Sequence, residues 1–161
     1  MSHRHAAWHT HCTTETKKRS KKRAARVQPR PRILIVEDSH SVGDTLACAL
    51  EQEGCSVLVA RTGREGIGMA KRARPDVIAL DVGRACQEGT DALAALGADP
   101  ATRGIPIVAL SAGDGKRTAA LRTQVARVFG EPFYLDEVVA AVLEVLDELT
   151  ASTTAPPATR R

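Results

Sequence analysis

The chain has 161 residues, of which 43% are hydrophobic and only 2% aromatic, a size that suits one ordinary domain with tails. No apolar run approaches the roughly 20 residues that cross a bilayer, and the N-terminus lacks the apolar segment of a secretory signal. We therefore expect neither a membrane span nor secretion. The four cysteines form no CxxC pair, which favours a reducing, cytoplasmic setting.

Charge divides the chain into two parts. Residues 1–32 hold 10 of the 23 lysines and arginines and one of the 19 acidic residues, a net charge of +9. With +4 for the whole chain, the remaining 129 residues carry −5. The basic part includes the run KKRSKKR at residues 17–23 and shows no apolar periodicity. We predict a basic, disordered N-terminal tail over residues 1–32.

From Ile33 the sequence alternates short apolar runs with longer amphipathic stretches, which is typical of strand–helix units around a parallel sheet. The apolar runs predict strands at 33–37, 56–60, 77–81, 105–110 and 126–130. The amphipathic stretches predict helices at 40–53, 63–73, 89–97, 115–124 and 134–149. Ser39 is expected to cap the first helix and Gly54 to end it, and Pro75 closes the second helical stretch.

Five such units predict an α/β domain with a flavodoxin-like, doubly wound (βα)5 fold and a five-stranded parallel sheet in the order 2-1-3-4-5. We place this domain at residues 33–149. The polar, proline-containing segment 150–161 is predicted to be a second disordered tail.

Acidic or hydroxyl side chains stand where four of the five predicted strands end. They are Glu37 at the end of the first strand and Asp38 after it, Asp81 at the end of the third, Ser111 after the fourth and Glu131 after the fifth. The carboxyl ends of parallel strands share one crevice, in which ligands bind. A crevice built mainly of acid suits a metal ion, together with a phosphoryl group.

The segment ILIVEDS…RPDVIALDV…IPIVALSA…EPF resembles the receiver domain of bacterial two-component response regulators, over roughly residues 32–149. Its motifs come in that family's order, with 43 residues from Asp38 to Asp81 and 30 from Asp81 to Ser111. The resemblance implies that Glu37, Asp38 and Asp81 hold Mg²⁺, whose preferred ligands are carboxylate oxygens. It also implies that Asp81 is the phosphoacceptor, because a carboxylate can form an aspartyl-phosphate, and that Ser111 contacts the phosphoryl group.

Two positions depart from the family. Receivers carry a lysine before Pro-Phe, and this chain has Glu131 there. Three residues earlier, Val128 stands where receivers often keep an aromatic switch residue. The role of Glu131 is open, since its carboxylate could repel the phosphoryl group, stay partly protonated, join the metal shell or be a solvated acid.

The resemblance implies a single-domain response regulator in a two-component phosphorelay, a signalling protein rather than an enzyme. A sensor histidine kinase or phosphotransfer protein would phosphorylate Asp81, and the last two helices would signal to another protein. Glu131 and Val128 leave a second function open, a phosphorylation-independent interaction module (a pseudo-receiver).

Three further patterns suggest other ligands. Residues 38–43 spell DxHxxG, as in cobalamin-binding domains of this topology, where His40 would be the cobalt ligand; the other motifs of those domains are absent. The tail's four histidines and Cys12 could bind Zn²⁺ or Ni²⁺, although a solvated tail is the simpler interpretation. The basic run could contact nucleic acid or an anionic membrane through phosphate charge.

Overall fold

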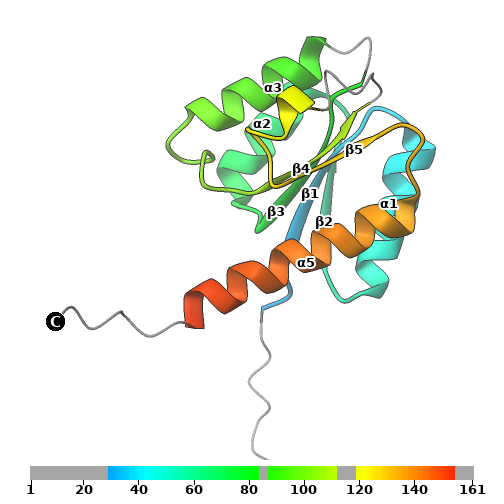
Figure 1. The fold of residues 1–161 in the computed structure, drawn as a ribbon, viewed down its shortest axis with the longest axis vertical. Helices are drawn as coiled ribbons and strands as arrows, with labels where there is room; N and C mark the ends of the chain where they lie inside the picture. The colour runs from blue at the N-terminus through cyan, green and yellow to red at the C-terminus, as the bar shows by residue number, and fades with distance from the viewer. Residues whose placement is uncertain (1–28, 84–86, 112–118, 155–161) are drawn as a thin grey trace, which may run out of the picture.

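A parallel β-sheet with helices on both faces forms the fold (Figure 1). The computed structural model describes residues 29–83, 87–111 and 119–154. The sheet has five strands in the order β2-β1-β3-β4-β5, and every neighbouring pair is parallel. The strands are β1 Arg32–Val36, β2 Ser56–Ala60, β3 Val77–Asp81, β4 Ile107–Ser111 and β5 Arg127–Gly130. The predicted strand order and fold class are confirmed.

Helices follow the strands at the predicted places. In the part of the chain that the structure describes, they are α1 His40–Gln52, α2 Gly63–Ala73, α3 Gln87–Ala98 and α5 Leu135–Thr154. Within the helix predicted at 115–124, residues 119–121 are helical, 122–124 form a turn and 115–118 lie outside the described residues. None of the described helices is both long enough and apolar enough to cross a membrane.

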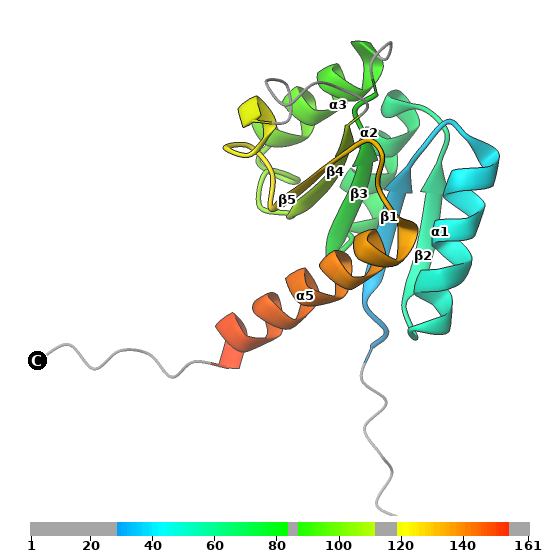
Figure 2. The same ribbon diagram turned by 45° about the vertical axis from the view of Figure 1, so that its right-hand side comes forward.

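Successive residues of β1 face opposite helix layers. Ile33 and Ile35 pack in a core with α1 and α5, whereas Leu34 and Val36 pack in a second core with α2 and α3. Figure 2 shows the two helix pairs on opposite sides of the sheet. Because both faces of the central strands are covered, these strands are apolar at successive positions, 33–36 in β1 and 77–80 in β3, rather than at alternate ones. The sheet is therefore doubly wound.

The sequence signals for the helix ends are confirmed. Ser39 is the N-cap of α1 and its hydroxyl accepts a hydrogen bond from the Val42 N–H at 3.5 Å. Gly54 follows the C-cap with a φ of 87°, a left-handed conformation that favours glycine. α2 begins after the N-cap Thr62, whose hydroxyl accepts from the Glu65 N–H at 3.2 Å. These caps fix where α1 and α2 begin at the carboxyl-end edge of the sheet.

The end of α5 differs from the prediction. The helix continues to Thr154, so residues 150–154, which we assigned to a disordered tail, are helical. Three hydroxyls donate to carbonyl oxygens three or four residues earlier, at 2.8 to 2.9 Å, namely those of Thr150, Ser152 and Thr153. Bonds of this kind satisfy polar side chains inside a helix, so the loss of apolar periodicity after Leu149 does not end it. Residues 155–161 lie outside the described part.

The start of the domain also differs by one residue. Arg32, which we assigned to the tail, is the first residue of β1 and pairs with Ser56 of β2. Its N–H donates to Asp76 Oδ2 at 2.7 Å, and its carbonyl accepts from the Asp76 N–H at 2.7 Å. Residues 1–28 lie outside the described part.

Candidate metal centre

Three carboxylates meet at the carboxyl ends of β1 and β3. Glu37 and Asp38 directly follow β1, and Asp81 is the last residue of β3. The two strands are parallel neighbours, with Val36 paired to Leu80, so both deliver their next residues to the same edge. One oxygen from each carboxylate lies within 4.8 Å of the other two. These three residues are called the acid group below.

Glu37 is the buried member of the acid group, with 6% of its surface exposed, while Asp38 is exposed and Asp81 half-buried. The pKa of Glu37 is raised to about 7, chiefly by burial; a hydrogen bond from the Ser39 N–H lowers it, and the negative charges of Asp81 and Asp38 also contribute to raising it. That bond reaches Glu37 Oε1 at 3.0 Å. A divalent cation bound here would lower the pKa of Glu37, because a nearby positive charge favours the ionised carboxylate.

A pocket of about 170 Å³ contains the acid group. The rest of its lining comes from the end of β1, the β2–α2 junction and the start of α3, as Val36, Arg61, Thr62, Gly63, Glu88 and Gly89. The sequence alone predicted no role at this site for Arg61, Thr62 or Glu88. The sequence does contain a signal that could have identified Arg61. It directly follows a predicted strand, which places it at the same edge of the sheet as the acids.

Two glycines shape the surroundings of Asp81. A β carbon at Gly89 would lie 2.4 Å from the Asp81 carbonyl oxygen, a distance that no real contact has, so only glycine lets the start of α3 approach the end of β3 this closely. A β carbon at Gly83 would lie 3.3 Å from each carboxylate oxygen of Asp81. Because this position carries no side chain, the Asp81 carboxylate stays accessible.

Ser111 and Glu131 come to the same edge on the other strands. Ser111 ends β4, where its backbone pairs with Gly130 at the end of β5; its side chain lies outside what the structure describes. Glu131 follows Gly130, is exposed, and forms a cis peptide bond with Pro132. Among the described residues, the set of acids close enough to share a metal ion consists of the acid group and does not include Glu131.

Of the other candidate ligands, the structure places one. His40 is the exposed first residue of α1. The tail histidines, Cys12 and the KKRSKKR run lie outside the described residues.

Comparison with protein families matches residues 33–143 to the response regulator receiver domain. Among curated proteins, the chain is 32% identical over 116 residues to the probable transcriptional regulatory protein TcrX of Mycobacterium tuberculosis, which covers 71% of this chain and 49% of TcrX. It is 34% identical over 96 residues to the protein PilH of Pseudomonas aeruginosa, which covers 55% of this chain and 79% of PilH. The chain thus spans about half the length of TcrX.

Solved structures with the same fold include receiver domains. The receiver domain of a signal transduction histidine kinase from Syntrophus aciditrophicus is 26% identical with a TM-score of 0.66, covering 81% of this chain and 98% of that one. A response regulator receiver domain protein from Methanospirillum hungatei is 24% identical, also with a TM-score of 0.66, covering 77% and 99%; at this identity it shows the fold alone. From the family match together with the curated relatives, the chain belongs to the response regulator receiver domain family, whose members are signalling modules of two-component systems.

Proposed function

We propose that this chain is a phosphoryl-accepting receiver in which Asp81 is the phosphoacceptor. The observation that carries this proposal is the acid group, in which Asp81 shares a pocket of about 170 Å³ with Glu37 and Asp38. A carboxylate can attack phosphorus and form an aspartyl-phosphate. The donor would be the phosphohistidine of a sensor histidine kinase or phosphotransfer protein, as the family implies.

The acid group fits Mg²⁺. Its three ligands are hard carboxylate oxygens from the ends of two adjacent strands, and an ion held there keeps positions for water and phosphate oxygens. When bound, Mg²⁺ would neutralise the charge that comes together as a phosphoryl group approaches a carboxylate. Glu37 and Asp38 would hold the ion, and Asp81 would both contact it and accept the phosphoryl group.

Two further roles are proposals that rest on the family. The Ser111 hydroxyl would contact the phosphoryl oxygens, in keeping with its position at the end of β4. The last two helices would carry the signal to a protein partner. The single-domain organisation and the cytoplasmic location expected from the sequence stay predictions, as does binding of the basic tail to nucleic acid or an anionic membrane.

Glu131 favours a second candidate function, a receiver that works without phosphorylation. At an effective dielectric constant of about 20, two unit charges about 4 Å apart interact by roughly 4 kcal/mol. If the ionised carboxylate of Glu131 faced the phosphoryl group as the family's lysine does, attraction would become repulsion of this order. Glu131 is exposed, so water screens its charge and this value is an upper limit.

The decisive experiment is phosphorylation of the full chain with a small phosphodonor and Mg²⁺, read by intact-mass spectrometry. We expect the wild type to gain the mass of one phosphoryl group and Asp81→Asn to gain none. The gain should disappear when Mg²⁺ is chelated. No gain in the wild type, under conditions that label a control receiver, would refute the phosphoacceptor proposal and favour the phosphorylation-independent module.

A further inference from the structure

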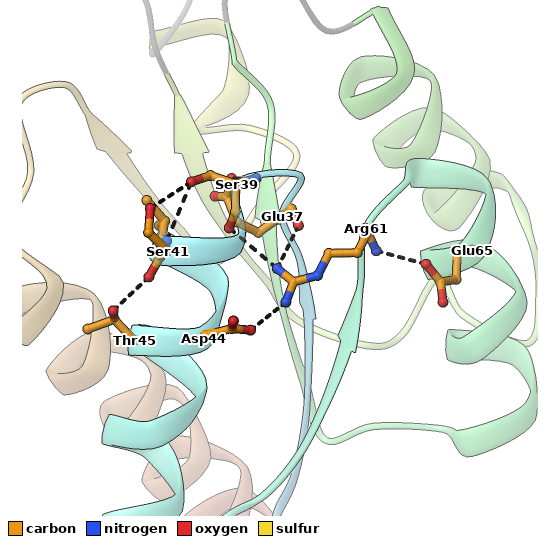
Figure 3. A network of polar contacts seen from close by, with 8 residues as sticks. Glu37, Ser39, Ser41, Asp44, Thr45, Arg61 and Glu65 are labelled. Carbon is orange, nitrogen blue, oxygen red and sulfur yellow. Dashed lines mark hydrogen bonds and ion pairs between the residues drawn. The ribbon is translucent and has the colours of Figure 1, made fainter.

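One guanidinium joins β2 to the segment that carries Glu37 and Asp38. Arg61 directly follows β2, and its Nη1 lies 3.5 Å from the carbonyl oxygen of Glu37 and 3.4 Å from that of Ser39. Its Nη2 forms an ion pair with the carboxylate of Asp44 in α1. Figure 3 shows the side chain reaching from β2 toward α1, with these contacts around the guanidinium. Arg61 therefore binds both ends of the acidic loop, which we define as residues 37–39.

The backbone of Arg61 is itself fixed. Its N–H donates to Glu65 Oε2 at 2.8 Å, a bond that ties it to the first turn of α2 (Figure 3). The neighbouring Ala60 carbonyl accepts from the Glu37 N–H at 3.0 Å, which continues the ladder between β1 and β2 to the start of the acidic loop. The guanidinium thus extends from a rigid base, and only 28% of the Arg61 side chain is exposed.

Gly43 provides the space that the guanidinium occupies. Gly43 is a buried residue of the first turn of α1, and its N–H donates to the Ser39 carbonyl at 2.9 Å, the same oxygen that Arg61 contacts. A β carbon at this position would lie 2.6 Å from Arg61 Nη1, closer than real contacts come. The same β carbon would lie 3.4 Å from Glu37 Cγ, which is an ordinary contact. A side chain at position 43 would therefore displace the guanidinium and leave Glu37 in place.

We propose that Arg61 is a positioning residue, which holds the backbone of the acidic loop so that Glu37 and Asp38 are oriented to bind Mg²⁺. This inference rests on the proposed function, because it concerns the metal of that site. Groups that orient metal ligands raise metal affinity without touching the metal. The positive charge of Arg61 has the opposite effect, since a cation close to the pocket repels Mg²⁺.

These opposite effects make the Mg²⁺ affinity of Arg61→Met a sharp test. If Arg61 positions the loop, the substitution weakens Mg²⁺ binding, by about tenfold. If Arg61 contributes only its charge, its removal strengthens binding. Isothermal titration of the full chain with Mg²⁺ at pH 8, with folding checked by circular dichroism, measures the affinity directly. Unchanged or tighter binding by folded Arg61→Met would overturn the inference.

Arg127→Met is the matched control. Arg127 also pairs with one carboxylate, Glu148 at 2.6 Å, and 35% of its side chain is exposed. It is the first residue of β5, so it lies at the opposite edge of the sheet from the acid group. We expect this variant, which loses the same charge, to bind Mg²⁺ like the wild type. Equal weakening in both variants would show that the loss of affinity is not specific to the contact with the acidic loop, and would overturn the role of Arg61.

Two further variants decide the question if Arg61→Met does not fold. Arg61→Lys keeps the charge, but its compact ammonium cannot span both carbonyls and the Asp44 carboxylate, so binding should weaken. Gly43→Ala keeps Arg61 and improves the helix-forming propensity of α1, yet its methyl group displaces the guanidinium. Weaker Mg²⁺ binding by folded Gly43→Ala supports the inference, and wild-type affinity in both variants overturns it. If the wild type binds no Mg²⁺, the proposed function fails and the role of Arg61 fails with it.

Discussion

Glu37 links the folding of this domain to pH. Its pKa is about 7 in the folded protein, against an ordinary value of 4.5, chiefly because it is buried. Between these values the native state keeps a proton that the unfolded state releases. The free energy of unfolding of the metal-free protein should therefore fall as pH rises through this window and level off above it. The fall from this group is at most roughly 3 kcal/mol, and urea unfolding in EDTA at pH 5 and pH 8 measures it.

Comparison with Glu37→Gln isolates this contribution from other titrating groups. The amide oxygen can still accept the hydrogen bond from the Ser39 N–H, but the side chain no longer ionises. The pH 5 to pH 8 difference should shrink in Glu37→Gln and persist in Glu88→Gln, which removes an exposed acid of the same pocket. Mg²⁺ at pH 8 should stabilise the wild type and Glu88→Gln, but not Glu37→Gln. An undiminished pH difference in Glu37→Gln would contradict the assignment.

We predict that the charge of Glu131 affects how readily Asp81 accepts a phosphoryl group. Replacing it by lysine restores the charge that the family carries before Pro-Phe, so Glu131→Lys should increase labelling of Asp81 by a small phosphodonor several-fold. Intact-mass spectrometry over time gives the rate and the final extent. Glu144→Lys makes the same charge change at an exposed position of α5 and should label like the wild type. If Glu131→Lys is labelled no faster and no further than the wild type, the charge at this position does not limit phosphorylation.

At the scale of elements, the contact between the end of β3 and the start of α3 sets the geometry around Asp81. A β carbon at Gly89 would lie 2.4 Å from the Asp81 carbonyl oxygen and 3.0 Å from Val82 Cα. Backbone atoms cannot move aside cheaply, so Gly89→Ala should destabilise the domain by about 1–3 kcal/mol and reduce labelling of Asp81.

Gly97 offers the control on the same helix. A β carbon there would meet nothing within 4 Å, so Gly97→Ala should leave stability unchanged or raise it by up to about 1 kcal/mol through better helix propensity. Urea unfolding of both variants measures the difference. Equal stability of Gly89→Ala and Gly97→Ala would show that α3 moves away from β3 without cost.

The elements were predictable where apolar pattern and capping residues agree. Because β1 and β3 are covered on both faces, each appears in the sequence as an uninterrupted apolar run ending in acid, and this places the acid group at one edge. Ser39 and Gly54 likewise fix the ends of α1 through local hydrogen bonds and φ. The apolar pattern stops at Leu149, however, and does not show that α5 continues to Thr154, where hydroxyls bond to carbonyl oxygens of the same helix.

Long-range contacts limit how much of the site can be predicted from the sequence. Arg61 lies 17 residues from Asp44 and 24 from Glu37 along the chain, and no local pattern reports that its guanidinium reaches both. The burial of Glu37, and hence its raised pKa, depends on how β1, β2 and α1 pack together. Sequence therefore predicts which acids share the edge, but not which of them is buried or which cation holds their loop.

The molecule as a whole combines a negatively charged domain with a basic N-terminal segment. Residues 33–161 carry −5 and residues 1–32 carry +9. Removal of residues 1–28, which keeps Arg32 in β1, should abolish salt-sensitive binding to a DNA duplex, because that binding depends on lysine and arginine contacts with phosphate. Fluorescence anisotropy at low and high salt measures it, and Asp81 labelling shows that the shortened chain is intact. Binding that survives the truncation, or a full chain that does not bind at low salt, would exclude the segment as a phosphate-binding tail.

The contact between Gly43 and Arg61 constrains how this sequence can change over time. With no β carbon at position 43, the guanidinium fits against α1; a larger residue there would displace it from this position. Conversely, losing the arginine removes the reason for keeping a glycine inside a helix, where it is a poor helix former. Substitutions at the two positions are therefore non-additive, and related sequences should inherit the pair together or replace it together.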